Sequence, residues 1–466
     1  MTSVAPPRED YHTGRAVMLA AVAALAGFLF GFDTAVINGA VTAVRDEFEM
    51  GSFLTGFVVS SALLGCVVGA WEAGKLADRY GRIRVMVIAA ALFTLSALGS
   101  GLAFGPWDLI VWRVVGGLGV GAASVIAPAY IAEIAPAAIR GRLGSLQQLA
   151  IVTGIFVSLL SDFALASAAG GAAEELALGL EAWRWMFLAE IVPALAYGIL
   201  SLQLPESPRY LVKKGEPAKA AEVLKHILKS GVDARIKEIA RTVRSETRST
   251  FADLRGPVLG LLPIVWVGLL LSVFQQFVGI NVIFYYSSAL WQQVGFTESD
   301  ALAITVITSI TNIVVTLVAI SLIDRVGRRI LLLIGSLGMA ASLGTLAVIF
   351  GTAPVIDGEP VIGDTPGTVA LFAANLFVVF FGMSWGPAVW VLLGEMFNNR
   401  IRAMALGLAA AAQWLSNFVV SITFPVLADL SLALAYGLYT AFALVSFFFV
   451  LKLVPDTKGK QLEDMV

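Results

Sequence analysis

A recurring series of long apolar stretches constrains this chain more than any other feature of its sequence. Each stretch holds roughly 20 apolar residues, the length that a helix needs to cross the hydrocarbon core of a bilayer. Backbone amides find no water in hydrocarbon, so the stretches are predicted to be helices. The twelve predicted spans cover residues 16–40, 54–76, 84–104, 107–132, 143–165, 183–204, 257–288, 300–323, 329–351, 367–395, 403–427 and 431–453.

Composition excludes several other classes of protein. With 58% hydrophobic and 14% charged residues, the chain would expose a large apolar surface in water. The formal charge of −2 gives no sign of nucleic-acid binding. His12 and His226 lie in polar stretches and Cys66 is the only cysteine, so we expect no metal site, no disulfide and no cofactor. The buried polar residues include neither a nucleophile paired with a base nor a phosphate-binding loop, so we expect no enzyme and no ATP-driven pump.

The positions of Lys and Arg predict how the chain is oriented in the membrane. All 31 except Arg45, Arg113 and Arg184 fall on one side, which the positive-inside rule assigns to the cytoplasm together with both termini. We therefore expect a multi-pass protein of the plasma (inner) membrane, with the glycine-rich segment 166–180 as a loose external loop. The predicted parts are a cytoplasmic N-terminus at 1–15, a six-helix half at 16–204, a cytoplasmic helical linker at 205–256, a second six-helix half at 257–453 and a cytoplasmic tail at 454–466.

Two elements recur in the same order in the two halves. Asp78-Arg79-Tyr80-Gly81-Arg82 follows the second span, and Asp324-Arg325-Val326-Gly327-Arg328 follows the eighth. Glu133 precedes Arg140 by seven residues after the fourth span, and Glu395 precedes Arg402 by seven after the tenth. We expect the carboxylates to meet guanidinium groups of the same half and to hold the cytoplasmic face shut. The alternative is that each Asp-Arg-x-Gly-Arg is only a tight turn whose positive charges set the topology.

Three further motifs are typical of one particular family of membrane proteins. They are Pro205-Glu206-Ser207-Pro208-Arg209, Gln275-Gln276-Phe277-Val278-Gly279-Ile280-Asn281 and Pro455-Asp456-Thr457-Lys458-Gly459. The chain resembles the sugar porter family of the major facilitator superfamily over nearly its whole length, and within it the bacterial glucose permeases and the xylose/proton symporter. One departure is Asp456, where the family usually has Glu. The resemblance implies a carrier that imports a hexose, D-glucose by expectation, and that works as a monomer.

Polar amides in an apolar span predict where the sugar binds. Gln275, Gln276 and Asn281 supply neutral donors and acceptors, and the glycine before Ile280 is a place for the helix to break. Glycine and proline around Trp385 suit a hinge in the helix that would move the tryptophan ring, which could pack against the sugar. Alternatively, the amides join helices by hydrogen bonds and Trp385 only packs. The resemblance implies a sugar site formed by Gln148, Gln275, Gln276, Asn281, Asn312, Trp385, Gln413 and Trp414. Ile155 replaces an amide of the xylose carrier, which favours glucose.

Charges within the predicted spans suggest a route for proton coupling. Asp33 and Arg113 lie at similar depths in the first and fourth spans and could pair, whereas a permanent ion pair that only locks the helices is the alternative. The resemblance implies that Asp33 accepts the proton, with Arg113 as its partner and Glu190 as an auxiliary acid. The predicted cytoplasmic gate charges are Asp78, Arg79, Arg82, Glu133, Arg140, Glu206, Asp324, Arg325, Arg328, Glu395 and Arg402.

Other functions stay open at this point. The chain could be a facilitator, or a symporter for another sugar or polyol such as xylose, galactose or inositol. Some members of the family act as sugar sensors that signal without moving cargo.

Overall fold

The computed structural model describes residues 11–136, 139–245, 250–356, 359–360, 362–398 and 400–455. Within this part of the chain, twelve helical segments are long and apolar enough to cross a membrane. They cover Thr13–Glu47, Ser52–Tyr80, Arg82–Gly101, Pro106–Ile134, Arg142–Ala169, Ala182–Ser201, Pro263–Gln293, Glu298–Leu322, Arg328–Thr352, Thr365–Met396, Met404–Leu430 and Leu432–Leu453. Each overlaps one predicted span, so the all-α, twelve-span prediction is confirmed.

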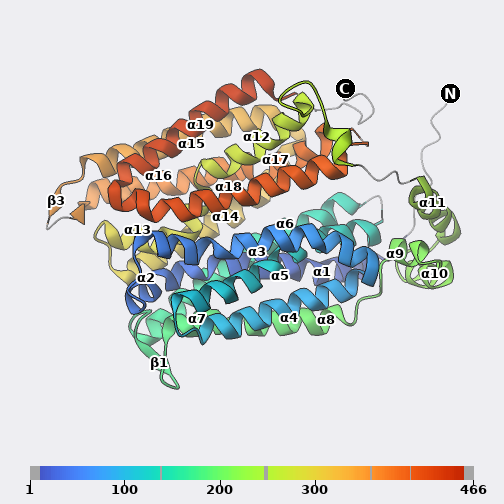
Figure 1. The fold of residues 1–466 in the computed structure, drawn as a ribbon, viewed down its shortest axis with the longest axis horizontal. Helices are drawn as coiled ribbons and strands as arrows, with labels where there is room; N and C mark the ends of the chain where they lie inside the picture. Colours follow the sequence, from blue (N-terminus) through green and yellow to red (C-terminus); the bar gives the residue numbers. More distant parts are fainter. Residues whose placement is uncertain are drawn as a thin grey trace.

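The helices form two bundles that lie side by side (Figure 1). The first bundle consists of α1 (Thr13–Ala35), α2 (Ile37–Glu47), α3 (Ser52–Tyr80), α4 (Arg82–Gly101), α5 (Pro106–Ile134), α6 (Arg140–Ala169), α7 (Ala182–Ala189) and α8 (Ile191–Ser201). The second consists of α12 (Pro263–Phe277), α13 (Ile280–Gln293), α14 (Glu298–Val326), α15 (Arg328–Thr352), α16 (Asp364–Met383), α17 (Trp385–Met396), α18 (Arg402–Leu430) and α19 (Leu432–Leu453).

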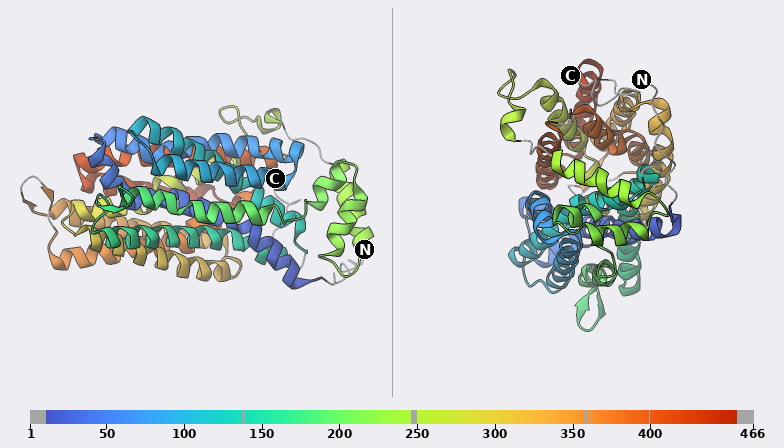
Figure 2. Two further views of the ribbon diagram at one scale, coloured as in Figure 1. Left: turned by 90° about the horizontal axis from the view of Figure 1, so that it is seen from below. Right: turned by 90° about the vertical axis from the view of Figure 1, so that its right-hand side faces the viewer.

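The short helices that connect the two bundles along the chain lie at one end of the molecule (Figure 2). They are α9 (Pro208–Lys213), α10 (Pro217–Lys225), α11 (Val232–Ser245) and the 3₁₀ helix η2 (Phe251–Leu254). We call this end, which the charge pattern assigns to the cytoplasm, the inner end, and the opposite end the outer end.

Two short hairpins lie at the outer end (Figure 1), where β1 (Glu175–Ala177) pairs with β2 (Leu180–Glu181) and β3 (Val355–Ile356) pairs with β4 (Glu359–Pro360). The segment 166–180 is therefore more ordered than the loose loop expected from sequence. Its first residues continue α6, and Leu178 and Gly179 both have positive φ, which suits a two-residue hairpin turn.

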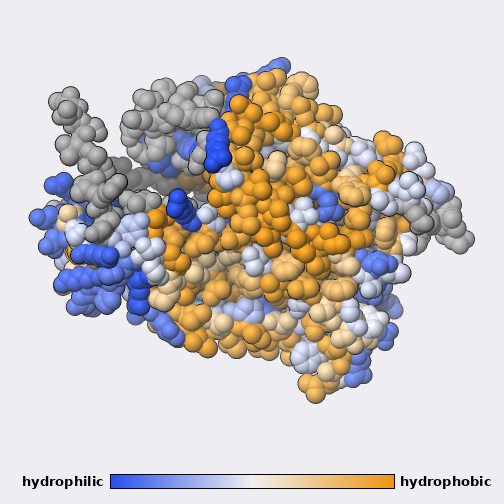
Figure 3. Space-filling view, turned by 180° about the vertical axis from the view of Figure 1, so that it is seen from behind, coloured by the Kyte–Doolittle hydropathy of each residue, from blue (hydrophilic) through white to orange (hydrophobic). Residues whose placement is uncertain are grey.

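Apolar side chains face outward along the middle of the molecule, with hydrophilic ones at its two ends (Figure 3). Trp71, Val192 and Phe372 are examples of large apolar residues that are exposed. This pattern is the reverse of a water-soluble protein and matches a bundle surrounded by lipid.

Four of the twelve spans are interrupted within their length. The interruptions lie at Val36 between α1 and α2, Glu190 between α7 and α8, Gly279 between α12 and α13, and Ser384 between α16 and α17. Gly279 has φ of 84°, a left-handed conformation that glycine adopts without steric cost, so the break predicted there is confirmed. Irregular backbone at membrane depth is tolerated where protein or a cavity surrounds it.

Hydrophobic packing joins the bundles mainly at the outer end. Val41 of α2 shares one core with Ile283 of α13 and with most buried apolar residues of the second bundle. Towards the inner end, Cys66 and Ala73 of α3 belong to a separate core whose buried members all come from the first bundle and the linker. Trp414 of α18 packs against both cores. The structure is therefore closed at its outer end.

Candidate transport site

The break between α12 and α13 brings the predicted amides together. Gln275 and Gln276 end α12, and Asn281 begins α13. The Asn281 Nδ2 donates a hydrogen bond to the Gln276 Oε1 at 2.5 Å. Because the helix turns at Gly279, these side chains lie around a break in the backbone and not along one regular helix face.

A second break lies directly beside the first. The Gln275 Nε2 donates to the backbone carbonyls of Trp385 (2.9 Å) and Gly386 (3.3 Å), which begin α17. The indole of Trp385 is fully buried, and its Nε1 donates to the Leu332 carbonyl and to the Ser336 Oγ of α15. In this state the Trp385 side chain points into its own bundle, and Gln275 forms its hydrogen bond with the Trp385 backbone.

The other residues of the predicted sugar site come from three further helices. Asn312 of α14 is buried, and its Oδ1 lies 3.7 Å from the position that a methyl group on Gly382 would take. Gln148 of α6 and Gln413 of α18 are both half-buried. The ring of Trp414 lies 5.6 Å from that of Phe30 in α1, so this tryptophan bridges the two bundles.

Several buried amide atoms have no hydrogen-bond partner among the described residues. These atoms are the Oε1 of Gln275, the Oε1 of Gln413, and both polar atoms of the Gln147 side chain. Unsatisfied acceptors and donors in an apolar setting are costly, and hydroxyl groups of a bound sugar or water can satisfy them. Gln147 was not predicted as a site residue, although it is an amide in the same apolar span as its neighbour Gln148.

The predicted acidic cluster assembles inside the first bundle. The Arg113 Nη1 donates to the Asp33 carbonyl oxygen at 2.9 Å and lies 3.4 Å from the Asp33 Oδ1. Glu190 lies close enough to interact electrostatically with both residues, and all three side chains are almost completely buried. A methyl group on Gly116 of α5 would lie 2.4 Å from the Ser96 Oγ and 2.9 Å from the Asp33 Oδ1, so the glycine leaves room for both side chains.

Both acids of this cluster stand at helix breaks. Asp33 lies in the last turn of α1, just before the interruption at Val36, and Glu190 is itself the residue between α7 and α8. Placing carboxyl groups at such breaks gives them backbone that can rearrange, as is common for charged groups at membrane depth.

Hydrogen bonds between the bundles at the outer end centre on Asn38, which the sequence analysis did not select. Its Nδ2 donates to the Phe284 carbonyl at 2.9 Å, and its Oδ1 accepts from the Ser288 N–H at 3.1 Å. The Ser288 hydroxyl also bonds to the Asn38 carbonyl. Nearby, Ser52 bonds to Asp429 across the two bundles. An asparagine at the end of an apolar span was the one sign in the sequence of a role for Asn38. Its partners could not be predicted, because they lie about 250 residues away in the chain.

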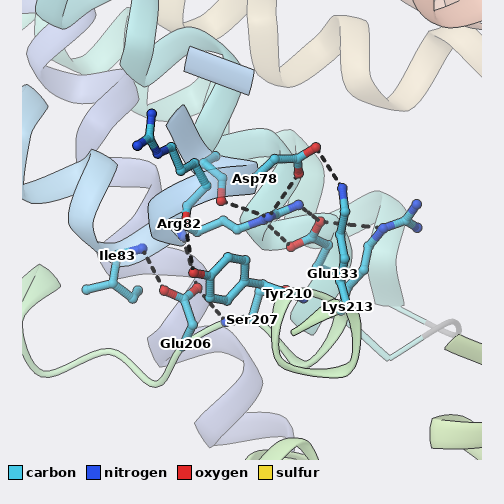
Figure 4. Close-up of polar contacts among 11 residues, drawn as sticks. Asp78, Arg82, Ile83, Glu133, Glu206, Ser207, Tyr210 and Lys213 are labelled. Carbon is cyan, nitrogen blue, oxygen red and sulfur yellow. Dashed lines mark hydrogen bonds and ion pairs between the residues drawn. The ribbon is translucent and has the colours of Figure 1, made fainter. Parts of the chain in front are cut away.

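Arg82 is the centre of a charge network at the inner end of the first bundle (Figure 4). Its Nη2 and Nε donate to the two carboxylate oxygens of Glu133 at 2.8 and 3.0 Å, and Asp78 lies 3.5 Å from its Nη1. Lys213 of α9 bonds to the other Asp78 oxygen at 2.7 Å. Bidentate pairing fixes the guanidinium plane and is stronger than a single contact.

Glu206 extends this network by binding the start of α4 (Figure 4). Its carboxylate accepts from the backbone N–H groups of Arg82 (3.0 Å) and Ser207 (2.8 Å). Anions are stabilised at the N-terminal end of a helix, where N–H groups are free. Gly81 has φ of 98°, and a methyl group there would collide with the Glu206 carboxylate. The Arg79 side chain is exposed and lies over the ring of Tyr80.

The second bundle repeats part of this arrangement. The Arg328 Nη2 donates to the Glu395 Oε1 at 2.8 Å, and Gly327 has φ of 99°, close to that of Gly81. Arg402 donates instead to the Phe397 carbonyl, so the seven-residue spacing from Glu395 does not mark a pair. Arg325 is exposed. The side chains of Arg140 and Asp324 lie outside the described residues, as does most of the motif that begins at Pro455.

Comparison with known proteins identifies relatives over the full length. The chain matches the family model for sugar (and other) transporters at residues 19–466. It is 57% identical over 465 residues to the glucose transport protein of Synechocystis sp., with 99% of each chain covered. It is 36% identical over 489 residues to the D-xylose-proton symporter of Escherichia coli (strain K12), with 98% of this chain and 96% of that one covered.

Solved structures agree with these sequence relatives. The partially occluded inward open conformation of the xylose transporter XylE from E. coli aligns with a TM-score of 0.82 at 35% identity, covering 96% of this chain and 100% of the other. The proton:xylose symporter XylE bound to 6-bromo-6-deoxy-D-glucose, a major facilitator superfamily protein, aligns with a TM-score of 0.79 at 36% identity, covering 98% and 99%. This chain is a twelve-span protein of the plasma membrane that belongs to the sugar transporter family of the major facilitator superfamily.

Proposed function

We propose that this protein imports D-glucose together with a proton by alternating access. The observation that carries the proposal is the buried pair of Asp33 and Arg113. Charges in hydrocarbon are costly and are kept where they serve transport. The 57% identical relative is a glucose transport protein, and the E. coli relative is a D-xylose-proton symporter.

The sugar would bind between the bundles, at the broken helices of the second one. Gln275, Gln276 and Asn281 stand at the first break, and the free Oε1 of Gln275 offers an acceptor to a sugar hydroxyl. Asn312, Trp385, Gln413 and Trp414 would complete the site from the same bundle, with Gln148 from the opposite side. Neutral amides and aromatic rings suit a ligand with many hydroxyls and an apolar ring face.

The proton would act at Asp33. Protonation removes the negative charge that Arg113 faces, so it weakens the pair and changes the relative stability of two arrangements of α1 and α5. Glu190 would assist as a second acid. The competing interpretation is a permanent ion pair that only stabilises helix packing.

We propose that the inner end faces the cytoplasm. In that orientation, the contacts of Asn38 seal the extracellular side. The charge networks at the inner end would keep the cytoplasmic side shut when the extracellular side opens. Their proposed members are Asp78, Arg79, Arg82, Glu133, Arg140, Glu206, Asp324, Arg325, Arg328, Glu395 and Arg402. We propose further that a single chain without a cofactor completes the cycle and that it catalyses no covalent reaction.

The test is uphill uptake of radiolabelled glucose into proteoliposomes with an imposed pH gradient. The parent protein should accumulate glucose against its gradient, and Asp33→Asn should abolish accumulation while still exchanging labelled for unlabelled glucose. An Asp33→Asn protein that accumulates glucose as well as the parent would show that Asp33 is not the coupling group.

The second candidate is a carrier for another sugar or polyol, because one relative is a D-xylose-proton symporter. Competition of glucose uptake by xylose, galactose and inositol separates these cargoes. If xylose competes more strongly than unlabelled glucose, the cargo assignment is wrong even when coupling is correct. A sugar that binds in equilibrium dialysis without any uptake would favour a sensor.

A further inference from the structure

One buried carboxyl group takes no part in the proposed sugar or proton sites. Asp162 lies on α6, seven residues before the helix ends at Ala169 near the outer end, and its side chain is fully buried. Neither of its carboxyl oxygens has a hydrogen-bond partner among the described residues. A carboxyl group at this depth is a candidate for function, although Asp162 was not among the residues predicted from the sequence.

The carboxyl group packs directly against the backbone of α2. A methyl group on Gly39 would lie 2.5 Å from the Asp162 Cβ and 2.8 Å from its Oδ2. The residue before Gly39 is Asn38, whose side chain forms the hydrogen bonds to α13 that join the bundles. Asp162 therefore supports the backbone segment that closes the outer end.

Charged groups on the helices and strand packed against α6 have other partners. Arg113 and Glu190 interact with Asp33, Arg184 forms ion pairs with Glu47 and Glu181, and Arg45 forms an ion pair with Asp46. The remaining acids accept hydrogen bonds: Asp108 from Trp112, Glu175 from the Gly179 N–H, Glu298 from the Ala172 N–H and Asp300 from Thr297. None of these contacts supplies a cation to Asp162. The carboxyl group is fully buried, and a polar group beside it, the Gly39 backbone N–H of α2, does not reach hydrogen-bond geometry in this structure.

A buried carboxyl group with no cation beside it among the described residues makes helix packing depend on its charge. Burial costs the ionised carboxylate far more free energy than the neutral acid. Separating α2 from α6, and so admitting water, removes most of that cost. The charged form therefore favours an open outer end, and the neutral form is compatible with the packing in this structure.

We propose that Asp162 is a proton-sensitive element of the outer gate, defined here as Asn38, Gly39 and Asp162. With a proton on Asp162, α2 packs against α6 and Asn38 bonds to α13. When the outer end opens, the proton passes to external water and the carboxylate keeps the gate open. The inference rests on the proposed alternating access only in assuming that the outer end opens, and it is separate from coupling at Asp33.

The experiment measures gate opening directly and needs no transport. Phe104 and Leu430 are exposed residues at the outer ends of opposite bundles, 86% and 71% accessible. Both are replaced by cysteine in a Cys66→Ser background and spin-labelled, and distances are recorded by pulsed electron resonance in nanodiscs between pH 5 and pH 9. In the otherwise unchanged protein, the fraction of long, open-gate distances should rise with pH.

Asp162→Asn keeps the shape of the side chain and removes its titration. The open fraction should then stay low throughout and fall roughly fivefold or more below that of the parent at the highest pH. Asp162→Glu should keep the pH response. If Asp162→Asn does not fold, Asp162→Ser serves as a smaller side chain without a carboxyl group. An unchanged pH response in either variant that lacks the carboxyl group overturns the inference.

Two controls distinguish this inference from the proposed function. Asp33→Asn should lose proton-driven accumulation yet keep the pH response of the gate. Glu174→Gln, which removes an exposed acid at the same end, should also keep that response. If the gate response disappears in Asp33→Asn and persists in Asp162→Asn, the proton acts on the gate through Asp33 and Asp162 has no such role.

Discussion

The two bundles share a backbone plan but place different chemistry at their broken helices. In the first bundle, Asp33 and Glu190 stand at breaks and are buried beside Arg113. In the second, the breaks at Gly279 and Ser384 present amides and backbone carbonyls, joined by Gln275. A duplicated fold thus supplies breaks at membrane depth in both halves. Under the proposed function, the side chains at those breaks suit the first half to protons and the second to sugar.

The largest expected effect is on stability and tests the charges of the first bundle. Arg113→Met should destabilise the protein by about 3–5 kcal/mol, because it leaves the buried Asp33 without its cation. The matched change in the second bundle, Arg328→Met, should cost only about 1 kcal/mol, since its partner Glu395 is partly exposed. Thermal unfolding in detergent measures both. Equal losses would show that burial does not separate the two bundles.

The next effect concerns the amides of the second bundle. Gln275→Ala should weaken glucose binding roughly ten- to a hundredfold, because it removes the hydrogen bond to the backbone of α17 and the proposed hydrogen bonds to the sugar. The pH dependence of uptake should stay as in the parent. Gln293→Ala, an amide at the end of α13, serves as the control in calorimetric or quenching titrations. A change in coupling ratio for Gln275→Ala would contradict the division between the bundles.

A smaller effect compares the two repeated turns. Gly81→Ala should destabilise by about 2 kcal/mol, because its φ is positive and the Glu206 carboxylate lies where the methyl group would go. Gly327→Ala should destabilise by about 1 kcal/mol from its positive φ. Chemical denaturation of the two variants gives the difference. If Gly327→Ala is the more damaging change, the turn of the second bundle carries a contact that its backbone angle alone does not reveal.

The smallest effect is expected at the surface of the second bundle. Hydrogen bonds from Thr250, followed by Arg400, lower the pKa of Asp253 to about 2. Because the pKa is lower in the folded protein, this contribution to stability is present above about pH 4 and is lost as the pH falls towards 2. The melting temperature of Asp253→Asn should lie slightly below that of the parent at pH 6 and approach it at pH 3. A constant difference would show that the charge of Asp253 is not what matters.

Much of the fold was predictable because apolar length and lysine and arginine placement act locally. All twelve predicted spans and the predicted break at Gly279 are present. Asp33 and Arg113, which were predicted to lie at similar depths, form an ion pair. The pairing of Glu133 was less predictable. Its spacing to Arg140 repeats in the second half, yet the guanidinium groups that meet it among the described residues are those of Arg82 and, at 4.0 Å, Arg209. Sequence spacing therefore revealed the repeat without revealing which groups bond.

Residue chemistry and chain length were enough to predict the membrane class, the two halves and the types of side chain available for sugar and proton binding. Which buried groups are satisfied depends on the packing of the helices. Trp385 turns its indole into α15, Asn38 finds its partners in α13, and Asp162 lies against Gly39 without a hydrogen-bond partner among the described residues. These outcomes depend on how helices far apart in the sequence pack, and a carboxyl group in an apolar span gains or lacks a partner only through that packing.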